Sequence, residues 1–177
     1  MKVVSIVTSF PRFKGDVLIP WIIKLIHLLR EQGVETSVFT SSYKGRKDED
    51  YEGMSVKRFR YFFKHYEKLS HDLAIPEKLK KDKRYFFLVP FFMLFGAFSA
   101  FNYARKNSFD LIHVHFPFPL IIFGICMKIV KKRPLIVSFH GSDINLAKKN
   151  LFFVMLLRFF MKLDRKSTRL NSSHTIQ

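Results

Sequence analysis

Hydrophobic and polar positions change their period several times along the first forty residues. Lys2–Val7 is a short run of mostly β-branched residues, which is typical of a buried strand. After a loop at Thr8–Asp16, apolar residues recur at helical spacing through Val17–Gln32, and Gly33 stands where a helix C-cap is expected. Val34–Thr40 then alternates as a second strand. This strand–loop–helix–strand unit predicts a right-handed crossover within a parallel sheet.

The following segments continue the alternation of strands and helices. A polar connection at Lys44–Gly53 leads to three further predicted strands, the first of them near an edge: Met54–Arg60, Phe109–Phe116 and Leu135–Val137. Helices are expected at about Leu120–Val130 and Leu146–Leu163. The predicted fold class is therefore α/β, a Rossmann-like parallel sheet with flanking helices. A chain of 177 residues is long enough for one such domain with a sizeable core.

The segment Tyr85–Tyr103 is strongly apolar but is interrupted by Pro90 and Gly96. Its length is borderline for a transmembrane helix, and Pro90 lies early in it. Because the chain on both sides has the pattern of an α/β domain, we expect a helix that is buried in the fold or lies in a membrane interface.

The net positive charge of the chain indicates which class of binding partner to expect. The chain has a formal net charge of +17, and a single cysteine, Cys126, which excludes an internal disulfide and fits a reducing compartment. A positive field of this size attracts phosphates on lipid, nucleic acid or a small ligand. Much of the charge lies in Lys57–Arg84, where basic residues alternate with Phe and Tyr.

Three interpretations of Lys57–Arg84 remain open. Basic groups with aromatic rings suit an anionic membrane surface, which we favour. The same mixture occurs in nucleic-acid grooves with stacking platforms, although the chain has no recognised nucleic-acid motif. The third interpretation is a solvated loop and edge strand whose rings pack inward. We expect a membrane surface as a partner and no nucleic acid.

The most informative motif is PLIVSFHGSDIN, at residues 134–145. A short apolar run leads into His140, and Gly141 allows a sharp turn before Asp143. An imidazole and a carboxylate therefore follow the end of a strand, where open parallel α/β sheets bind ligands. The motif also fits a strand–turn–helix junction with Ser142, Asp143 or Asn145 as helix cap, and both roles are compatible.

Four segments in order, VTSFPRFKGD, GVETSVFT, DLIHVHF and PLIVSFHGSDIN, resemble the N-terminal half of a family 4 glycosyltransferase with the GT-B fold. The resemblance covers about residues 1–163. It implies two Rossmann-like domains that face each other across a cleft, with the acceptor held mainly by the N-terminal domain and the nucleotide-sugar by the C-terminal domain. It also implies transfer with retention of anomeric configuration, no metal and no cofactor beyond the nucleotide-sugar substrate.

The resemblance implies roles for individual residues. Gly15 matches the glycine whose backbone approaches the donor diphosphate, and Asp16 beside it is an acceptor contact or the N-cap of a helix at Val17. His140 matches the histidine that meets the transferred sugar. Asp143 would orient its loop or bind acceptor, and His115 points toward the same crevice.

The strand order that this fold implies, with the five expected strands numbered along the chain, is 3-2-1-4-5. Loops after the first and fourth strands then meet at the switch point. We expect His113 and His115 to face opposite sides of the sheet, with His113 in the core. On that basis, and because no Cys or Glu completes a ligand set, a zinc site built from His113, His115 and His140 is not expected.

The C-terminal residues differ in composition from the rest. Asp164–His174 closely resembles a translated sequencing-library adapter. We therefore expect Asp164–Gln177 to be non-biological or disordered, and the chain to lack the donor-binding C-terminal domain that would be its partner in the same protein. Alone, it should be an inactive fragment.

The expected function follows from the resemblance and the charge. The parent protein would transfer a sugar from a nucleotide-sugar to a lipid-linked acceptor or a cell-surface polysaccharide precursor. It would be a cytoplasmic protein, held peripherally at the inner face of the membrane. The alternative is a non-catalytic, peripheral membrane-binding module.

Overall fold

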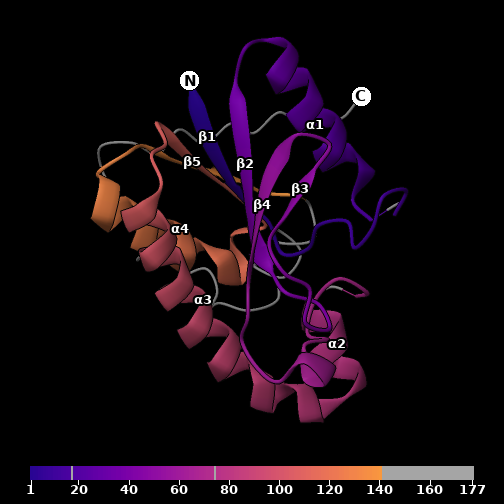
Figure 1. Cartoon of the computed structure of the whole chain (residues 1–177). Coiled ribbons are helices and arrows are strands. Elements are labelled where there is room, and N and C mark those ends of the chain that lie inside the picture. The colour runs from indigo at the N-terminus through magenta and orange to yellow at the C-terminus, as the bar shows by residue number, and fades with distance from the viewer. Residues whose placement is uncertain (17, 74, 141–177) are drawn as a thin grey trace, which may run out of the picture.

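A computed structural model describes residues 1–16, 18–73 and 75–140 and contains one six-stranded sheet (Figure 1). The strands are β1 (Lys2–Ile6), β2 (Glu35–Ser41), β3 (Glu49–Tyr51), β4 (Met54–Phe59), β5 (Leu111–His115) and β6 (Leu135–Ser138). Their order is β3-β4-β2-β1-β5-β6, and only β3 runs antiparallel to its neighbour. The predicted α/β Rossmann-like class and the order of the five expected strands are confirmed.

Helices cover both faces of the sheet. They are α1 (Pro20–Glu31), α2 (Ile75–Lys81), α3 (Leu88–Lys106) and α4 (Pro117–Lys131), with 3₁₀ turns at Lys64–Tyr66 and Lys83–Phe87. Figure 1 shows α3 and α4 side by side on one face and α1 on the other. The expected helix at Leu146–Leu163 lies outside the described residues.

Two local expectations were wrong. The polar connection at Lys44–Gly53 contains β3, a strand of three residues that returns to β4 through a tight turn at Glu52 and Gly53, both with positive φ. Helix α1 begins at Pro20 rather than at Val17, since proline favours the first helical position. Helix α4 is kinked at Phe118, whose backbone is not helical, so its regular part follows from Pro119, close to the expected start at about Leu120.

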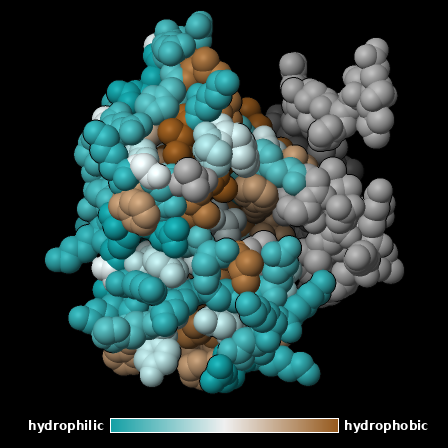
Figure 2. Space-filling view, turned by 90° about the vertical axis from the view of Figure 1, so that its right-hand side faces the viewer, coloured by the Kyte–Doolittle hydropathy of each residue, from teal (hydrophilic) through white to brown (hydrophobic). Residues whose placement is uncertain are grey.

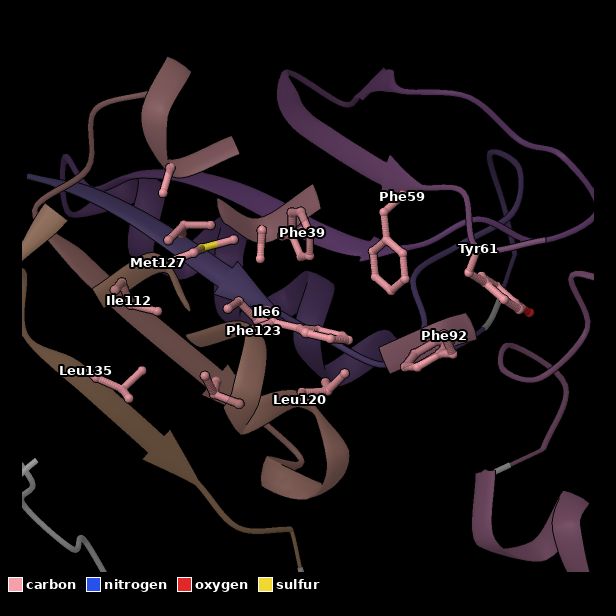
Figure 3. Close-up of a cluster of buried hydrophobic side chains, with 14 of the residues drawn as sticks. Ile6, Phe39, Phe59, Tyr61, Phe92, Ile112, Leu120, Phe123, Met127 and Leu135 are labelled. Atoms are coloured by element: carbon pink, nitrogen blue, oxygen red, sulfur yellow. The ribbon is translucent and has the colours of Figure 1, made fainter. Parts of the chain in front are cut away.

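The larger core lies between the sheet and the α3–α4 layer and combines aromatic rings with aliphatic side chains (Figure 3). Phe59 lies at its centre, with ring centroids 5.4 Å from Phe39, 5.3 Å from Phe92 and 5.3 Å from Phe123. Tyr61 adds a further edge-on contact with Phe92 at 5.2 Å. The Phe39 and Phe59 rings are stacked and the other pairs meet edge to face, and both arrangements are favoured for aromatic rings at these distances. Some of the 22 phenylalanines of the chain therefore have a packing role.

Helix α3 contributes a narrow stripe to this core. Its buried positions recur every four residues and become small toward the C-terminal end: Leu88, Phe92, Gly96, Ala100 and Ala104. A Cβ atom at Gly96 would overlap the Phe123 ring of α4. The glycine therefore sets how closely α3 and α4 approach.

We predict that Gly96→Ala lowers the free energy of unfolding by about 1–3 kcal/mol, because overpacking against Phe123 outweighs the gain of ~1 kcal/mol in helix propensity. Denaturant unfolding measures the change. In a Phe123→Leu background, which removes the obstructing ring, the same substitution should become neutral or stabilising. An equal loss in both backgrounds would contradict this account of the α3–α4 contact.

Candidate functional site

Parallel pairing brings two histidines together at the carboxyl edge of the sheet. His115 is the last residue of β5 and is paired in register with Ser138 at the end of β6. Two residues later, His140 turns back over this edge, and its Nε2 lies 3.2 Å from Nδ1 of His115. His115 is 1% exposed, whereas His140 is half-buried. The pair thus has one ring fixed in the protein and one at its surface.

His113 belongs to the same group, which corrects the expectation that it faces the opposite side of the sheet from His115. Residues two apart on a strand share a face, and the two ring centroids are only 3.9 Å apart. Nε2 of His113 lies 2.8 Å from the hydroxyl oxygen of Ser138. His113 is therefore a partly buried neighbour of the site and not a core residue.

Trp21, in the first turn of α1, covers the histidine pair. Its ring centroid lies 4.4 Å from that of His140 and 5.9 Å from that of His115. The periodic pattern identified Trp21 only as an apolar helix position. Trp21 directly follows Pro20, and the helix there follows the loop that begins at the end of β1. This position could have indicated a role at the edge of the sheet.

Burial keeps this cluster uncharged near neutral pH. Desolvation, with smaller contributions from His113 and His140, lowers the pKa of His115 to about 2. Burial likewise lowers the pKa of His113 to about 4 and brings that of His140 below its ordinary value. Two neutral imidazoles that meet nitrogen to nitrogen can share only one proton, so the tautomers of His115 and His140 are coupled.

The opposite-face argument against a zinc site no longer holds, because all three histidines gather at one edge. Within residues 1–16, 18–73 and 75–140, however, no set of three His, Cys, Asp or Glu groups has an arrangement that could hold a metal ion. Nε2 of His113 is engaged with Ser138, and Nε2 of His140 with His115. The described geometry therefore fits hydrogen bonding to a ligand better than coordination.

Backbone strain flanks the histidine pair. Ile19, just before Pro20, and Phe116, just after His115, both adopt the left-handed conformation, with φ values of 47° and 59°. That region is costly for a bulky or β-branched side chain. The Phe116 ring also contacts the His140 ring, at 4.6 Å between centroids. Strain of this kind is concentrated at binding and catalytic sites.

The loop after β1 holds Gly15 and Asp16. Gly15 is exposed with φ +87°, and nothing lies near the position of an added Cβ atom. Its backbone is thus accessible to a ligand. Asp16 is buried, and its two carboxylate oxygens accept hydrogen bonds from the Arg12 side chain at 2.8 and 3.1 Å. These bonds lower the pKa of Asp16 to about 2. The N-cap of α1 is Ile19, so the capping alternative for Asp16 is wrong.

Arg58 anchors this loop from β4, and the sequence pattern gave no sign of it. Its side chain is fully buried, and Nη2 donates a hydrogen bond to the carbonyl oxygen of Pro11 at 2.6 Å. Nε donates to Glu49 at 3.0 Å. Although burial alone would raise the pKa of Glu49, hydrogen bonds from Arg58 and Arg46 bring it below its ordinary value.

Arg58 also fixes a neighbouring hydrogen-bond chain. His71 Nε2 lies 3.5 Å from Arg58 Nη1, which can only donate. His71 must then carry its proton on Nδ1, 2.8 Å from the Ser70 hydroxyl, which in turn lies 2.7 Å from the hydroxyl of Ser41. Desolvation and the nearby charge of Arg58 lower the pKa of His71 to about 3. A buried charge thus orients the polar groups of Ser70 and His71 beside Ser41 at the end of β2.

The predicted site residues therefore form two groups along one edge. His115 and His140 meet beside β5 and β6. The loop of Gly15 and Asp16 borders a separate hollow of about 240 Å³ on the β3 side, lined in part by Phe13, Lys14 and Tyr51. Figure 2 shows the face with β3 and α1 as mostly hydrophilic, with hydrophobic side chains in small groups. Asp143 lies outside the described residues.

Comparison with known proteins shows the family of the chain. The family model described as Glycosyltransferase Family 4 matches residues 21–171, which is most of the chain. A comparison with curated proteins finds no match.

The buried histidines predict a pH dependence of stability. Unfolded histidines, with pKa near 6.5, bind protons that His71, His113 and His115 do not bind in the fold. The stabilisation that comes from keeping these histidines neutral is therefore fully present above about pH 6.5. It is lost as the pH falls toward their folded pKa values, by up to about 1.4 kcal/mol per pH unit for each histidine. We predict that His115→Asn reduces the slope of the free energy of unfolding against pH, between about pH 6 and pH 5, by the amount that one histidine contributes. Denaturant unfolding at each pH measures this free energy.

Measurements above about pH 7.5 provide the control for this variant. There the histidines are neutral in both the folded and the unfolded state, so any difference reports packing and hydrogen bonding alone. If His115→Asn and the original protein showed the same slope below pH 6, burial would not be what keeps His115 neutral.

Proposed function

Because the chain belongs to glycosyltransferase family 4, we propose that it forms the acceptor-side half of a retaining enzyme that transfers a sugar from a nucleotide-sugar. The observation that carries the proposal is the contact of His140 with His115 beneath Trp21, at the carboxyl edge of a parallel sheet. Ligands of open α/β sheets bind at this edge. We further propose that a second, donor-binding domain completes the enzyme.

The proposed chemistry needs a neutral polar group beside the sugar. In a retaining transfer, positive charge develops on the anomeric carbon as the bond to the diphosphate breaks. A protonated histidine there would oppose this charge, whereas a neutral imidazole can hydrogen-bond a sugar hydroxyl and hold the ring in place. Burial lowers the pKa of His140, which favours the neutral form. His115 holds the Nε2 side of that ring in a fixed orientation.

The loop after β1 would supply the remaining contacts of this half. The exposed backbone of Gly15 is available to approach the donor diphosphate. Asp16 would act on the acceptor through Arg12, which occupies both of its oxygens. We assign Asp143 to the acceptor or to the orientation of its own loop. The proposed reaction needs no metal and no cofactor.

We predict that His140→Ala reduces transfer on the order of 100-fold, as expected for loss of one positioned group at the reacting centre. The natural gene product that carries this chain should be incubated with membranes and a panel of sugar-labelled UDP- and GDP-hexoses, and labelled lipid and polysaccharide counted. His65→Ala, a surface histidine outside the site, is the matched control. Equal transfer by both variants would exclude His140 from the reaction.

We also propose that the domain docks on the cytoplasmic face of a membrane through α3. Large apolar residues are exposed on the outer face of this helix and on the turn before it. They are Phe87 (64% exposed), Leu94 (69%), Phe98 (66%) and Phe101 (41%). Basic residues stand at both ends of the stretch. Such a surface suits insertion among lipid headgroups and brings the site close to a lipid-linked acceptor or a polysaccharide precursor.

The stretch Lys83–Lys106 is long and apolar enough to cross a membrane by length and composition. Every fourth residue of α3, however, is buried against the core. That pattern favours docking over spanning. The same surface would also serve a non-catalytic membrane-binding module, whose vesicle binding and biological role would both survive His140→Ala.

We predict that Phe98→Ser weakens binding to phospholipid vesicles about tenfold, because a large aromatic side chain can no longer leave water. Vesicle co-sedimentation measures the change. Leu28→Ser on α1, where Leu28 is 49% exposed, is the control and should have little effect. If both variants bound vesicles as the original protein does, α3 would not be the docking surface.

A further inference from the structure

A groove of about 470 Å³ runs between β4 and helix α3. Its sheet wall comes from residues 55–60 and its helix wall from residues 95–107. Hydrogen bonds fix the helix wall. The Tyr103 hydroxyl donates to Ser37 on β2 at 3.1 Å, and the side chain of Asn107 donates to the Tyr103 carbonyl oxygen at 2.9 Å. The groove is therefore formed before any ligand arrives.

The two ends of the helix wall differ in chemistry. Phe95 and Phe98 lie toward one end and are 49% and 66% exposed, continuous with the apolar face of α3. Asn102, Lys106 and Asn107 line the wall toward the other end. Across the groove, Lys57 and Arg60 project from the sheet side. The groove is thus amphipathic, apolar at one end and basic along the rest.

The basic groups are not equally available. Lys57 is held by Asp48 at 2.7 Å, and Arg60 by Glu67 at 2.6 Å. Among the described residues, no carboxylate lies within ion-pair distance of Lys106. Asp48 accepts a hydrogen bond from the backbone of Arg58 through its other oxygen, at 2.8 Å. An incoming anion would therefore meet Lys106 directly and would compete with Asp48 for Lys57.

We propose that this groove binds the phosphate headgroup of an anionic phospholipid, with Lys106 and Lys57 on the phosphate and the acyl chains leaving past Phe98 into the bilayer. The inference rests on the proposed docking of α3 and adds to it a site that selects lipid charge. An amphiphile fits both ends of the groove. Phosphate binding alone would leave the aromatic end unused, and docking by apolar contact alone would leave the basic walls unused.

Substitutions that remove a single charge but keep a polar side chain test the site without disturbing its walls. Lys106→Gln removes the unpaired cation, and Lys24→Gln on α1 removes an equal charge outside the groove. Asp48→Asn keeps the oxygen that accepts from Arg58 but releases Lys57. Asp50→Asn is its control, because Asp50 also accepts a backbone hydrogen bond, from Gly53 at 2.7 Å, outside the groove.

Binding to two kinds of vesicle should be measured, one of phosphatidylcholine and one of an equal mixture of phosphatidylcholine and phosphatidylglycerol. On the anionic vesicles, we expect Lys106→Gln to bind about fivefold more weakly and Asp48→Asn about fivefold more tightly. Lys24→Gln and Asp50→Asn should change binding by less than about twofold. On phosphatidylcholine all four should match the original protein.

Each alternative outcome overturns the proposal in a recognisable way. If Lys106→Gln and Lys24→Gln weakened binding equally, net charge and not the groove would set the preference for anionic lipid. If no variant bound vesicles and the original protein did not either, the proposed docking would fail together with the groove. A single-stranded oligonucleotide bound with the same dependence on Lys106 and Asp48 would assign the groove to nucleic acid. None of these results bears on sugar transfer, which the His140 experiment measures separately.

Discussion

The site depends on one geometrical constraint, the parallel pairing of neighbouring strands. The carboxyl ends of parallel strands lie at the same edge of a sheet. Strand pairing therefore brings together side chains that are far apart in the sequence. The ends of β5 and β6 place His115 beside His140, although 25 residues separate them. The end of β1 places the loop of Gly15 at the same edge. The crossover helix α1 then brings Trp21 back over the histidines.

The two faces of the sheet therefore differ in the chemistry of their side chains. On the α1 face, polar side chains are buried next to one another, and burial keeps the histidines neutral. On the other face, packed aromatic rings hold α3 and α4, and α3 keeps a second apolar face outward. A domain built in this way can present a sugar-binding edge and a lipid-binding surface at the same time. The proposed enzyme would use both.

The sequence was sufficient for what long hydrophobic patterns determine. The pattern predicted the α/β class, and the resemblance to family 4 glycosyltransferases implied the order of five strands and a crevice shared by His140 and His115. It failed for β3, since three residues with two acidic side chains carry no strand signal. Burial within Lys57–Arg84 is mixed: Arg58, Phe59 and Tyr61 are buried, whereas Phe63 and Tyr66 are exposed. Whether a charge in such a run is solvated depends on a partner elsewhere in the chain, as Glu49 is for Arg58, and no local pattern records that partner.

The wrong expectation for His113 has a different cause. Side chains two residues apart on a strand point to the same face, so the sequence itself places His113 on the side of His115.

The central claim rests on the contact between His115 and His140, which ¹⁵N-detected NMR of the imidazole rings tests directly. The account predicts that at pH 7 both rings are neutral, with complementary tautomers that place one proton between His115 Nδ1 and His140 Nε2. Two rings that titrate independently near pH 6.5, or that carry a proton on both facing nitrogens at neutral pH, would contradict it.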